Sequence, residues 1–331
     1  MIQIVYIPYG CIVYTLYYKQ KYLKTITMTI VKQKSLTSFM WLSVGAAITT
    51  IALKSAAYWL TGSIGLLSDA LESIINLVAA LSALYLLRLA EKPPDDDHLY
   101  GHTKAEYFSS IIEAGLIICA ALSIGYTAID RLVYPQPIDN TTIGIIISVV
   151  ASLINLAVAL ALLKIGKKHN SITLEADGHH LLTDVWTSVG VIAGIALVGI
   201  THIYILDPLV AIAVAVNILF TGVQLIKKSA LGLMDTSLPE PDLQKIKGIM
   251  ESYENQGVAY HGLRTRQSAT RSFMSVHLLV PGKLSVQQGH DISEEIEEKI
   301  AKAFPQLTIL THLEPLEDPK SHADISIDRK R

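Results

Sequence analysis

Long apolar stretches separated by short polar segments dominate the chain between residues 39 and 226. A helix needs about 20 mostly apolar residues to cross the hydrocarbon core of a bilayer. Six stretches reach this length with few charged residues, and they predict membrane-spanning helices at 39–60, 64–90, 106–133, 141–163, 178–200 and 205–226. We therefore expect a six-helix transmembrane domain at residues 36–230.

The pattern changes after the sixth stretch, because charged and polar residues become frequent and no later segment is long and apolar enough to span a bilayer. In the second of three expected strands, apolar residues alternate with polar ones. In the following helix, Ile292, Ile296 and Ile300 recur at four-residue spacing. Residues 236–316 thus predict a small α+β domain with a helix at 240–254, strands at 258–267 and 271–280, a helix at 286–303 and a strand at 307–313.

The two ends of the chain do not fit either domain. The uncharged run from Ile2 to Tyr18 contains Pro8 and has its positive charges after it, which is the reverse of a signal peptide. Residues 1–35 are interpreted as an N-terminal extension, and two origins stay open: a genuine extension, or a start assigned too early, with Met28 as the true first residue. Residues 317–331 are expected to form a flexible tail.

Composition agrees with a membrane protein. Apolar residues make up 51% of the chain and charged residues only 17%, against about 25% in soluble domains. The formal net charge of −2 gives no electrostatic footprint for nucleic acid. The two cysteines, Cys11 and Cys119, lie far apart among apolar residues and indicate neither a disulfide framework nor a thiolate metal site.

The distribution of Lys and Arg predicts the orientation in the membrane, since short loops rich in these residues stay cytoplasmic. The loops on one side of the expected bundle contain only Arg131. The other side holds Lys32, Lys34, Arg88, Lys92, Lys104, Lys164, Lys167, Lys168, Lys227 and Lys228. Both termini and the α+β domain are therefore expected in the cytoplasm.

Ionisable residues inside the expected spans predict a metal site, because such residues are costly in a bilayer and usually functional. Glu72 and Asn76 are four residues apart on the second span, and His180 and Asp184 repeat that spacing on the fifth. Two helices that each present such a pair can close a four-ligand site of the kind that suits zinc and its neighbours. The alternative is that these side chains are structural hydrogen-bonding groups.

Three further ionisable residues lie close to these pairs in the sequence. Asp69 is one turn before Glu72 and is expected to face a vestibule. Asp177 and His179 fall at the expected membrane entrance of the fifth span, where solvation is the simpler interpretation.

The segment between the second and third spans carries the most specific motif, Pro94-Asp95-Asp96-Asp97-His98-Leu99-Tyr100-Gly101-His102-Thr103-Lys104-Ala105-Glu106. This run of acidic residues followed by His-x-x-Gly-His-x-Lys-x-Glu resembles the signature of the cation diffusion facilitator family, and most closely its bacterial ferrous-iron and zinc efflux branch. Leu263 to Ser268, with the order Leu-Arg-Thr-Arg-Gln-Ser, resembles a second motif of that family.

The resemblance implies a homodimer in the bacterial inner membrane, with a six-helix bundle and a cytoplasmic ferredoxin-like domain in each subunit. It implies a metal and proton antiporter that removes a divalent metal cation from the cytoplasm, with the metal as both substrate and regulator and no organic cofactor. An enzyme is the competing class. The chain has no His-Glu-x-x-His helix and no obvious nucleophile paired with a base.

Family site residues carry over to matching positions of this chain. The transport site falls on Glu72, Asn76, His180 and Asp184, the four residues found from their spacing. The resemblance also implies a loop site at Asp95, His98 and His102, a cytoplasmic-domain site at His261, His277, His290, His312 and Glu314, and a dimer salt bridge between Lys104 and Asp235.

The identity of the metal is left open by one departure from the family pattern. Many zinc-moving members have aspartate where Glu72 and Asn76 stand, and an amide offers only a neutral carbonyl oxygen. Zinc and iron(II) are the leading candidates, and a manganese or cobalt exporter stays open. A membrane-bound metal sensor that does not transport is the alternative function.

Overall fold

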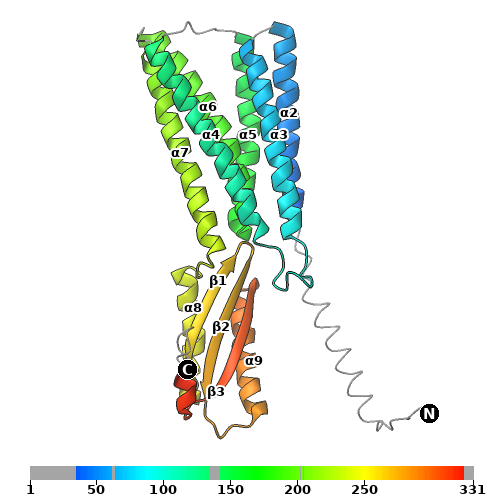
Figure 1. Ribbon diagram of the computed structural model, residues 1–331, viewed down its shortest axis with the longest axis vertical. Helices are drawn as coiled ribbons and strands as arrows, with labels where there is room; N and C mark the ends of the chain where they lie inside the picture. The colour runs from blue at the N-terminus through cyan, green and yellow to red at the C-terminus, as the bar shows by residue number, and fades with distance from the viewer. Residues whose placement is uncertain (1–34, 62–63, 135–141, 202, 204, 324–331) are drawn as a thin grey trace, which may run out of the picture.

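The computed structural model describes residues 35–61, 64–134, 142–201, 203 and 205–323. Within these ranges, only the backbone is described at residues 61, 64–72, 142–145, 191–192, 195–196, 198–199 and 207. The predicted start at Met28 and the end of the predicted tail lie outside these residues. The described chain forms a long helix bundle above a small α+β domain (Figure 1).

Six long helices form the bundle: α2 (Thr37–Thr61), α3 (Ile64–Ala90), α4 (Ala105–Val133), α5 (Thr142–His169), α6 (Ile172–Thr201) and α7 (Leu206–Leu233). By length and composition, α2, α3, α4, α5 and α7 each contain a segment able to cross a membrane. The sixth helix, α6, has 30 residues and packs between the others. The prediction of a helical membrane domain is confirmed.

Helix α6 begins six residues earlier than predicted, at Ile172 instead of residue 178. Only Asn170 and Ser171 separate it from α5. Asn170 adopts a left-handed conformation with φ of 54°, which asparagine tolerates better than most residues and which reverses the chain within one turn. The polar start of α6 is therefore part of the bundle.

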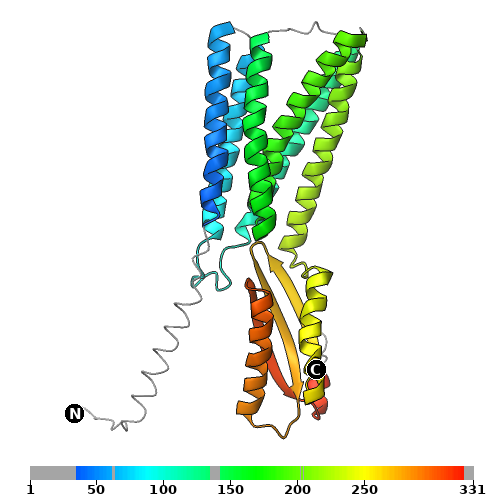
Figure 2. The ribbon, with the colours of Figure 1, turned by 180° about the vertical axis from the view of Figure 1, so that it is seen from behind.

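The helices fall into two groups, α2, α3 and α5 on one side and α4, α6 and α7 on the other, which diverge away from the α+β domain (Figures 1 and 2). Helix α6 connects the groups. Its Leu174 packs in an apolar core with Met40 and Leu162, whereas its Ala176 packs in a second core with Ile117 and Ile218.

The C-terminal domain has the predicted αββαβ order of a ferredoxin-like layer, and its sheet has the order β1-β2-β3. Strand β1 is antiparallel to β2, and β2 is parallel to β3. Its elements are α8 (Glu240–Glu251), η1 (Glu254–Gln256), β1 (Ala259–Ser268), β2 (Arg271–Val280), α9 (Val286–Ala303), β3 (Leu307–Pro315) and η2 (Pro319–His322).

One face of this sheet packs on α8 and α9. The alternation predicted for the second strand is present, because Met274, Val276 and Leu278 are buried in the same core as Ile296 and Ile300 of α9. The side chain of Ser285 and that of Gln288 form a reciprocal capping box that starts α9 at the predicted residue. The opposite face of the sheet carries His261, His277 and His312, one on each strand.

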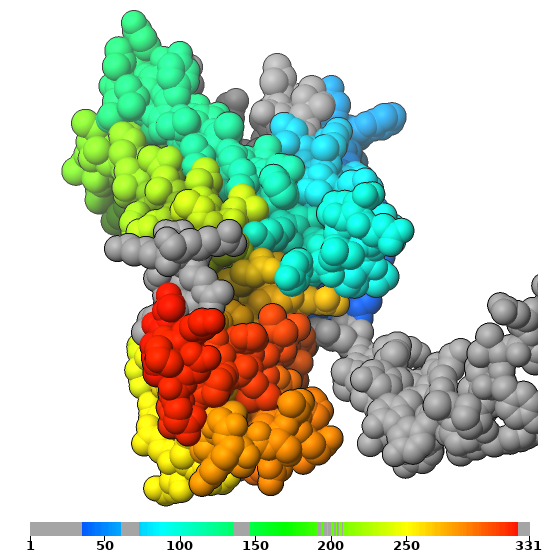
Figure 3. All heavy atoms as spheres, turned by 60° about the horizontal axis from the view of Figure 1, so that its bottom comes forward, coloured from blue at the N-terminus to red at the C-terminus, as the bar shows by residue number. Residues whose placement is uncertain are grey.

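The β1–β2 hairpin contacts the bundle directly. The backbone N–H of Ala269 donates a 2.8 Å hydrogen bond to the Tyr107 hydroxyl of α4, and the hydroxyls of Thr103 and Ser268 lie 2.8 Å apart. In Figure 3 the hairpin, drawn in gold, lies against the loop that precedes α4, drawn in cyan. All these groups are buried, so the two domains meet at a polar joint.

The end of β1 also holds the linker that follows α7, which explains the second sequence motif. The Thr265 hydroxyl accepts a hydrogen bond from the Leu238 N–H at 3.2 Å, and the Gln267 side chain donates to the Ser237 carbonyl at 2.7 Å. Arg266 binds Asp235 at 3.2 Å. Thr265, Arg266 and Gln267 of the motif therefore connect β1 to the linker that follows α7.

Candidate functional site

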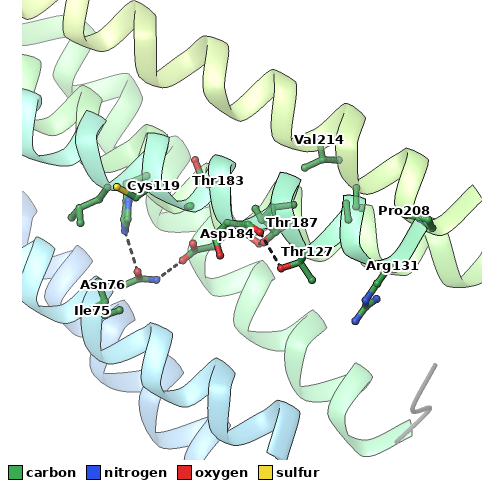
Figure 4. A pocket seen from close by; sticks show the side chains of 18 residues that line it. Ile75, Asn76, Cys119, Thr127, Arg131, Thr183, Asp184, Thr187, Pro208 and Val214 are labelled. Atoms are coloured by element: carbon green, nitrogen blue, oxygen red, sulfur yellow. Dashed lines mark hydrogen bonds between the residues drawn. The ribbon is translucent and has the colours of Figure 1, made fainter. Parts of the chain in front are cut away.

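Three of the four predicted transport-site residues meet between α3 and α6. The Asn76 amide donates a 2.6 Å hydrogen bond to Asp184 Oδ2, and Asn76 Oδ1 lies 3.1 Å from His180 Nε2 (Figure 4). His180 is only 5% exposed. The four-residue spacing on α6 places His180 and Asp184 one turn apart on one face, so both reach the same asparagine.

These contacts fix which group donates. The Asn76 nitrogen faces a carboxylate, so its Oδ1 faces His180 and can only accept. His180 therefore carries a proton on Nε2 in this arrangement. Since a metal ligand nitrogen must be deprotonated, a metal bound at Nε2 has to displace that proton.

The three residues line the inner end of a cavity of about 640 Å³ formed by α3, α4, α6 and α7. The cavity extends past Thr127 and Thr187 to Arg131 and Pro208, at the end of the bundle remote from the C-terminal domain (Figure 4). Cys119, for which the sequence indicated no metal site, lies on its wall. The site is thus reached from one side by a partly hydroxyl-lined path.

The other ionisable residues near the spans have different outcomes. Glu72 and Asp69 belong to α3, but their side chains lie outside the described residues. Asp177 is not solvated as expected, since it is 1% exposed. The early start of α6 places it inside the bundle, whereas His179 is only half-buried.

Two residues at this site were missed from the sequence. Asn155 of α5 donates a second hydrogen bond to Asp184 Oδ2, at 3.2 Å. Glu113 of α4 is fully buried, and its Oε2 lies 3.8 Å from His180 Nδ1. The signal for Glu113 was present, because a carboxylate seven residues into an apolar span is itself a functional indicator.

The predicted loop ligands come together ahead of α4. Asp95 Oδ1 lies 3.0 Å from His98 Nδ1, and Asp95 Oδ2 lies 3.3 Å from His102 Nε2. One ligand atom from each residue falls within 4.8 Å of the others, a spacing that a metal ion can occupy. Gly101 has φ of +82°, and this left-handed turn brings His102 back beside His98.

The negative charge of the loop favours the binding of a cation. Partial desolvation raises the pKa of Asp95, but hydrogen bonds from the side chain and backbone of His98 and the charges of both histidines outweigh it, so the pKa lies below its ordinary value. Asp96 and Asp97 are exposed beside it. A carboxylate that stays ionised is available as a ligand at neutral pH.

The predicted C-terminal ligands lie in a row across the face of the sheet opposite α8 and α9. His261 of β1 pairs in register with His277 of β2, which pairs with His312 of β3. A bulge after His261, where Gly262 has φ of +61°, interrupts the register.

Glu314, which the family resemblance assigned to this site, joins the row. Its Oε2 lies 3.0 Å from His261 Nε2 and 3.4 Å from His277 Nδ1, and its Oε1 lies 3.5 Å from His312 Nε2. Ligand atoms of His261, His277 and Glu314 all lie within 4.8 Å of one another. The donor set of imidazoles and a carboxylate fits a divalent transition metal.

Two other histidines lie in this domain. His290 of α9 is exposed and approaches Glu294 at 4.0 Å, and within one chain the structure does not bring it to the row. His322, which the sequence analysis did not consider, lies with its ring 6.4 Å from that of His261.

Lys104 and Asp235 form an ion pair of 2.9 Å within one chain, at the joint between bundle and domain. The hydrogen bond from Lys104 holds the pKa of the Asp235 carboxyl below its ordinary value, and Arg266 adds to the effect. The described chain is a single copy, so the predicted salt bridge across a dimer stays a prediction.

Comparison with known proteins agrees with this architecture. Residues 40–234 match the family model of the cation efflux transmembrane domain. The chain belongs to the cation diffusion facilitator family. Residues 238–316 match the model of the cytoplasmic domain of cation efflux proteins, which indicates homodimerisation.

Relatives cover most of the chain. An uncharacterized transporter of Synechocystis, sll1263, is 51% identical over 280 residues, which is 85% of this chain and 90% of that protein. The cation-efflux pump FieF of Salmonella arizonae is 28% identical over 269 residues, covering 81% and 89%. A solved chain of CzrB in a zinc form is 33% identical and covers 24% of this chain and 92% of its own, with a TM-score of 0.23.

The family assignment and the apolar helices establish an integral membrane protein that acts as a cation efflux transporter and not as an enzyme. The family assignment and the apolar helices also indicate that this membrane is the bacterial inner membrane. Relatives of this family move divalent metal cations.

Proposed function

We propose that this transporter exports a divalent transition metal, zinc or iron(II), from the cytoplasm in exchange for protons. The transport site consists of Glu72, Asn76, His180 and Asp184. The observation that carries the proposal is the junction of Asn76, His180 and Asp184 on the wall of the cavity.

Exchange follows from competition for the same atoms. The proton on His180 Nε2 occupies the position at which a metal would bind, and the Asn76 amide donates a hydrogen bond to Asp184 Oδ2. A metal entering from the cytoplasm releases the proton, and protons arriving through the remote cavity displace the metal. Ionised Glu72 and Asp184 carry −2 together, which neutralises a divalent ion.

The other two clusters are assigned to supply and regulation. Asp95, His98 and His102 would hold a metal at the bundle surface. His261, His277, His312 and Glu314, with His290 from the family pattern, would hold metal in the C-terminal domain and bias the dimer toward a transport-competent form. The hydrogen bond between Ala269 and Tyr107 connects the C-terminal domain directly to α4, so that a change in the domain can reach the bundle.

The proposal includes a topology and an assembly. Both termini and the C-terminal domain face the cytoplasm, since the Lys and Arg residues concentrate on that side. Two copies associate near the Lys104–Asp235 pair, which lies where the bundle meets the domain.

Metal uptake by proteoliposomes tests the proposal. A zinc-sensitive dye inside the vesicles should report zinc entry that a pH gradient accelerates, and iron(II), manganese or cobalt should compete according to their affinity for the site. Asp184→Ala should abolish entry while insertion and dimerisation persist. A sensor without transport would bind zinc in detergent and show no uptake with any gradient.

A further inference from the structure

Glu113 lies at the centre of the bundle in an environment that a carboxylate rarely occupies. It is fully buried on α4, and among the described residues neither of its carboxylate oxygens has a hydrogen-bond partner. A buried charge without a partner is strongly unfavourable, so such a residue usually serves a site.

The nearest partner of Glu113 is the imidazole of His180. Glu113 Oε2 lies 3.8 Å from His180 Nδ1, while the other ring nitrogen, Nε2, lies 3.1 Å from Asn76 Oδ1. The ring therefore stands between a carboxylate on α4 and the ligand set on α3. A small shift of either side chain would shorten 3.8 Å to a hydrogen bond.

We infer that Glu113 is a positioning residue of the transport site: it accepts the Nδ1–H of His180 and thereby holds Nε2 toward the metal. This inference rests on the proposed function of His180. A ligating histidine generally donates its second N–H to a carboxylate or carbonyl, which fixes the tautomer and ring orientation and raises its basicity.

Direct ligation of the metal by Glu113 does not fit the geometry. Among the described residues, Glu113 does not form a group of three His, Cys, Asp or Glu ligand atoms close enough together to hold an ion. Its contact is with the nitrogen of His180 that faces away from Asn76. A metal bound at Nε2 would stand in series with the imidazole and the Glu113 carboxyl group.

The inference also accounts for Asn76. Where a carboxylate is replaced by an amide, the ligand set loses one negative charge. Glu113 places a carboxyl group behind the histidine, with its Oε2 3.8 Å from Nδ1. The site thus keeps a carboxyl group behind the ligands where the ligand set itself has an amide.

Zinc binding to the full chain in detergent tests this assignment. A background with His98→Ala, His102→Ala, His261→Ala and His277→Ala removes two histidines from each of the other two proposed metal clusters, and competition with a zinc-chelating dye then gives the affinity of the transport site. In this background Glu113→Gln, which keeps size and removes charge, should weaken zinc affinity by about 10- to 100-fold. Thermal unfolding should show that the variant stays folded.

A matched control and a double-mutant cycle separate positioning from packing. Glu106→Gln neutralises another buried carboxylate of α4, one that contacts Ser171 and not His180, and should leave zinc affinity unchanged. In a His180→Ala protein, Glu113→Gln should cause no further loss, because its effect passes through the imidazole.

The outcomes are distinct. Unchanged affinity in Glu113→Gln would overturn the inference, and so would an additive loss in the His180→Ala protein, which would make Glu113 an independent ligand. If His180→Ala itself leaves zinc affinity unchanged, the proposed transport site is wrong and the role of Glu113 falls with it.

Discussion

Asn76→Asp is the substitution whose effect depends most directly on the geometry of the site. The Asn76 nitrogen lies 2.6 Å from Asp184 Oδ2, so the change replaces a donor by a second carboxylate in contact with the first. It removes a hydrogen bond to a charged group, worth about 1.5–3 kcal/mol. Even if the two carboxylates relax to about 4 Å, their repulsion is about 4 kcal/mol at an effective dielectric constant of about 20.

A repulsion of this size corresponds to about three powers of ten in an equilibrium constant. A divalent cation between the carboxylates relieves it, and so does a proton. Zinc affinity should therefore rise at high pH, by up to about 1,000-fold, and should fall more steeply with acidification because one more proton must leave. An added anionic ligand should also favour zinc over iron(II) and manganese.

Dye competition between about pH 6 and 9 measures both effects in the purified protein. Asn155→Asp is the matched control, since Asn155 also contacts Asp184 Oδ2, at 3.2 Å, but belongs to none of the four proposed ligands. Asn155→Asp should change the pH dependence of zinc binding, but it should not shift the metal preference toward zinc. Identical selectivity and identical pH profiles in Asn76→Asp and the wild type would show that Asn76 does not contact the ion.

Three predictions concern the C-terminal domain and its joint with the bundle. Asp235→Asn should lower the free energy of unfolding at pH 7 by at most about 1 kcal/mol, because the pair is half-exposed. Since the folded pKa of Asp235 is lowered, this difference should vanish as pH falls below the ordinary value of about 3.9 and through the folded one, and a constant difference would refute the ion-pair explanation. Tyr107→Phe leaves the Ala269 N–H without its acceptor and should cost about 1–3 kcal/mol in thermal unfolding; no loss would mean that water replaces the contact. His261→Ala combined with His277→Ala should lower the zinc stoichiometry of the full chain and remove zinc-dependent stabilisation, and unchanged titration curves would make both histidines structural.

Most of the fold could be predicted because it follows local patterns. Apolar length located the spans, and strict alternation located β2 at the residues observed. The start of α6 was missed, since its first turns are polar and become buried only by packing against four neighbouring helices. Asp177 was assigned to solvent for the same reason.

The site was partly predictable. Four-residue spacing placed His180 and Asp184 on one face, and family likeness paired them with Asn76. Spacing along one helix does not say which neighbouring helix that face meets, so Glu113 on α4 and Asn155 on α5 required the packed bundle. In the C-terminal domain the strand register, which a single strand cannot specify, aligned the three histidines.

The central claim, exchange of metal for protons at His180, is tested most directly by recording both fluxes in the same proteoliposomes. One dye reports zinc and a second reports pH inside the vesicles, after a pH gradient is imposed. The wild type should show zinc and proton movements in opposite directions with a constant ratio, and both should disappear together in His180→Ala. Zinc movement that continues in His180→Ala, or that proceeds in the wild type without any proton movement, would contradict the account.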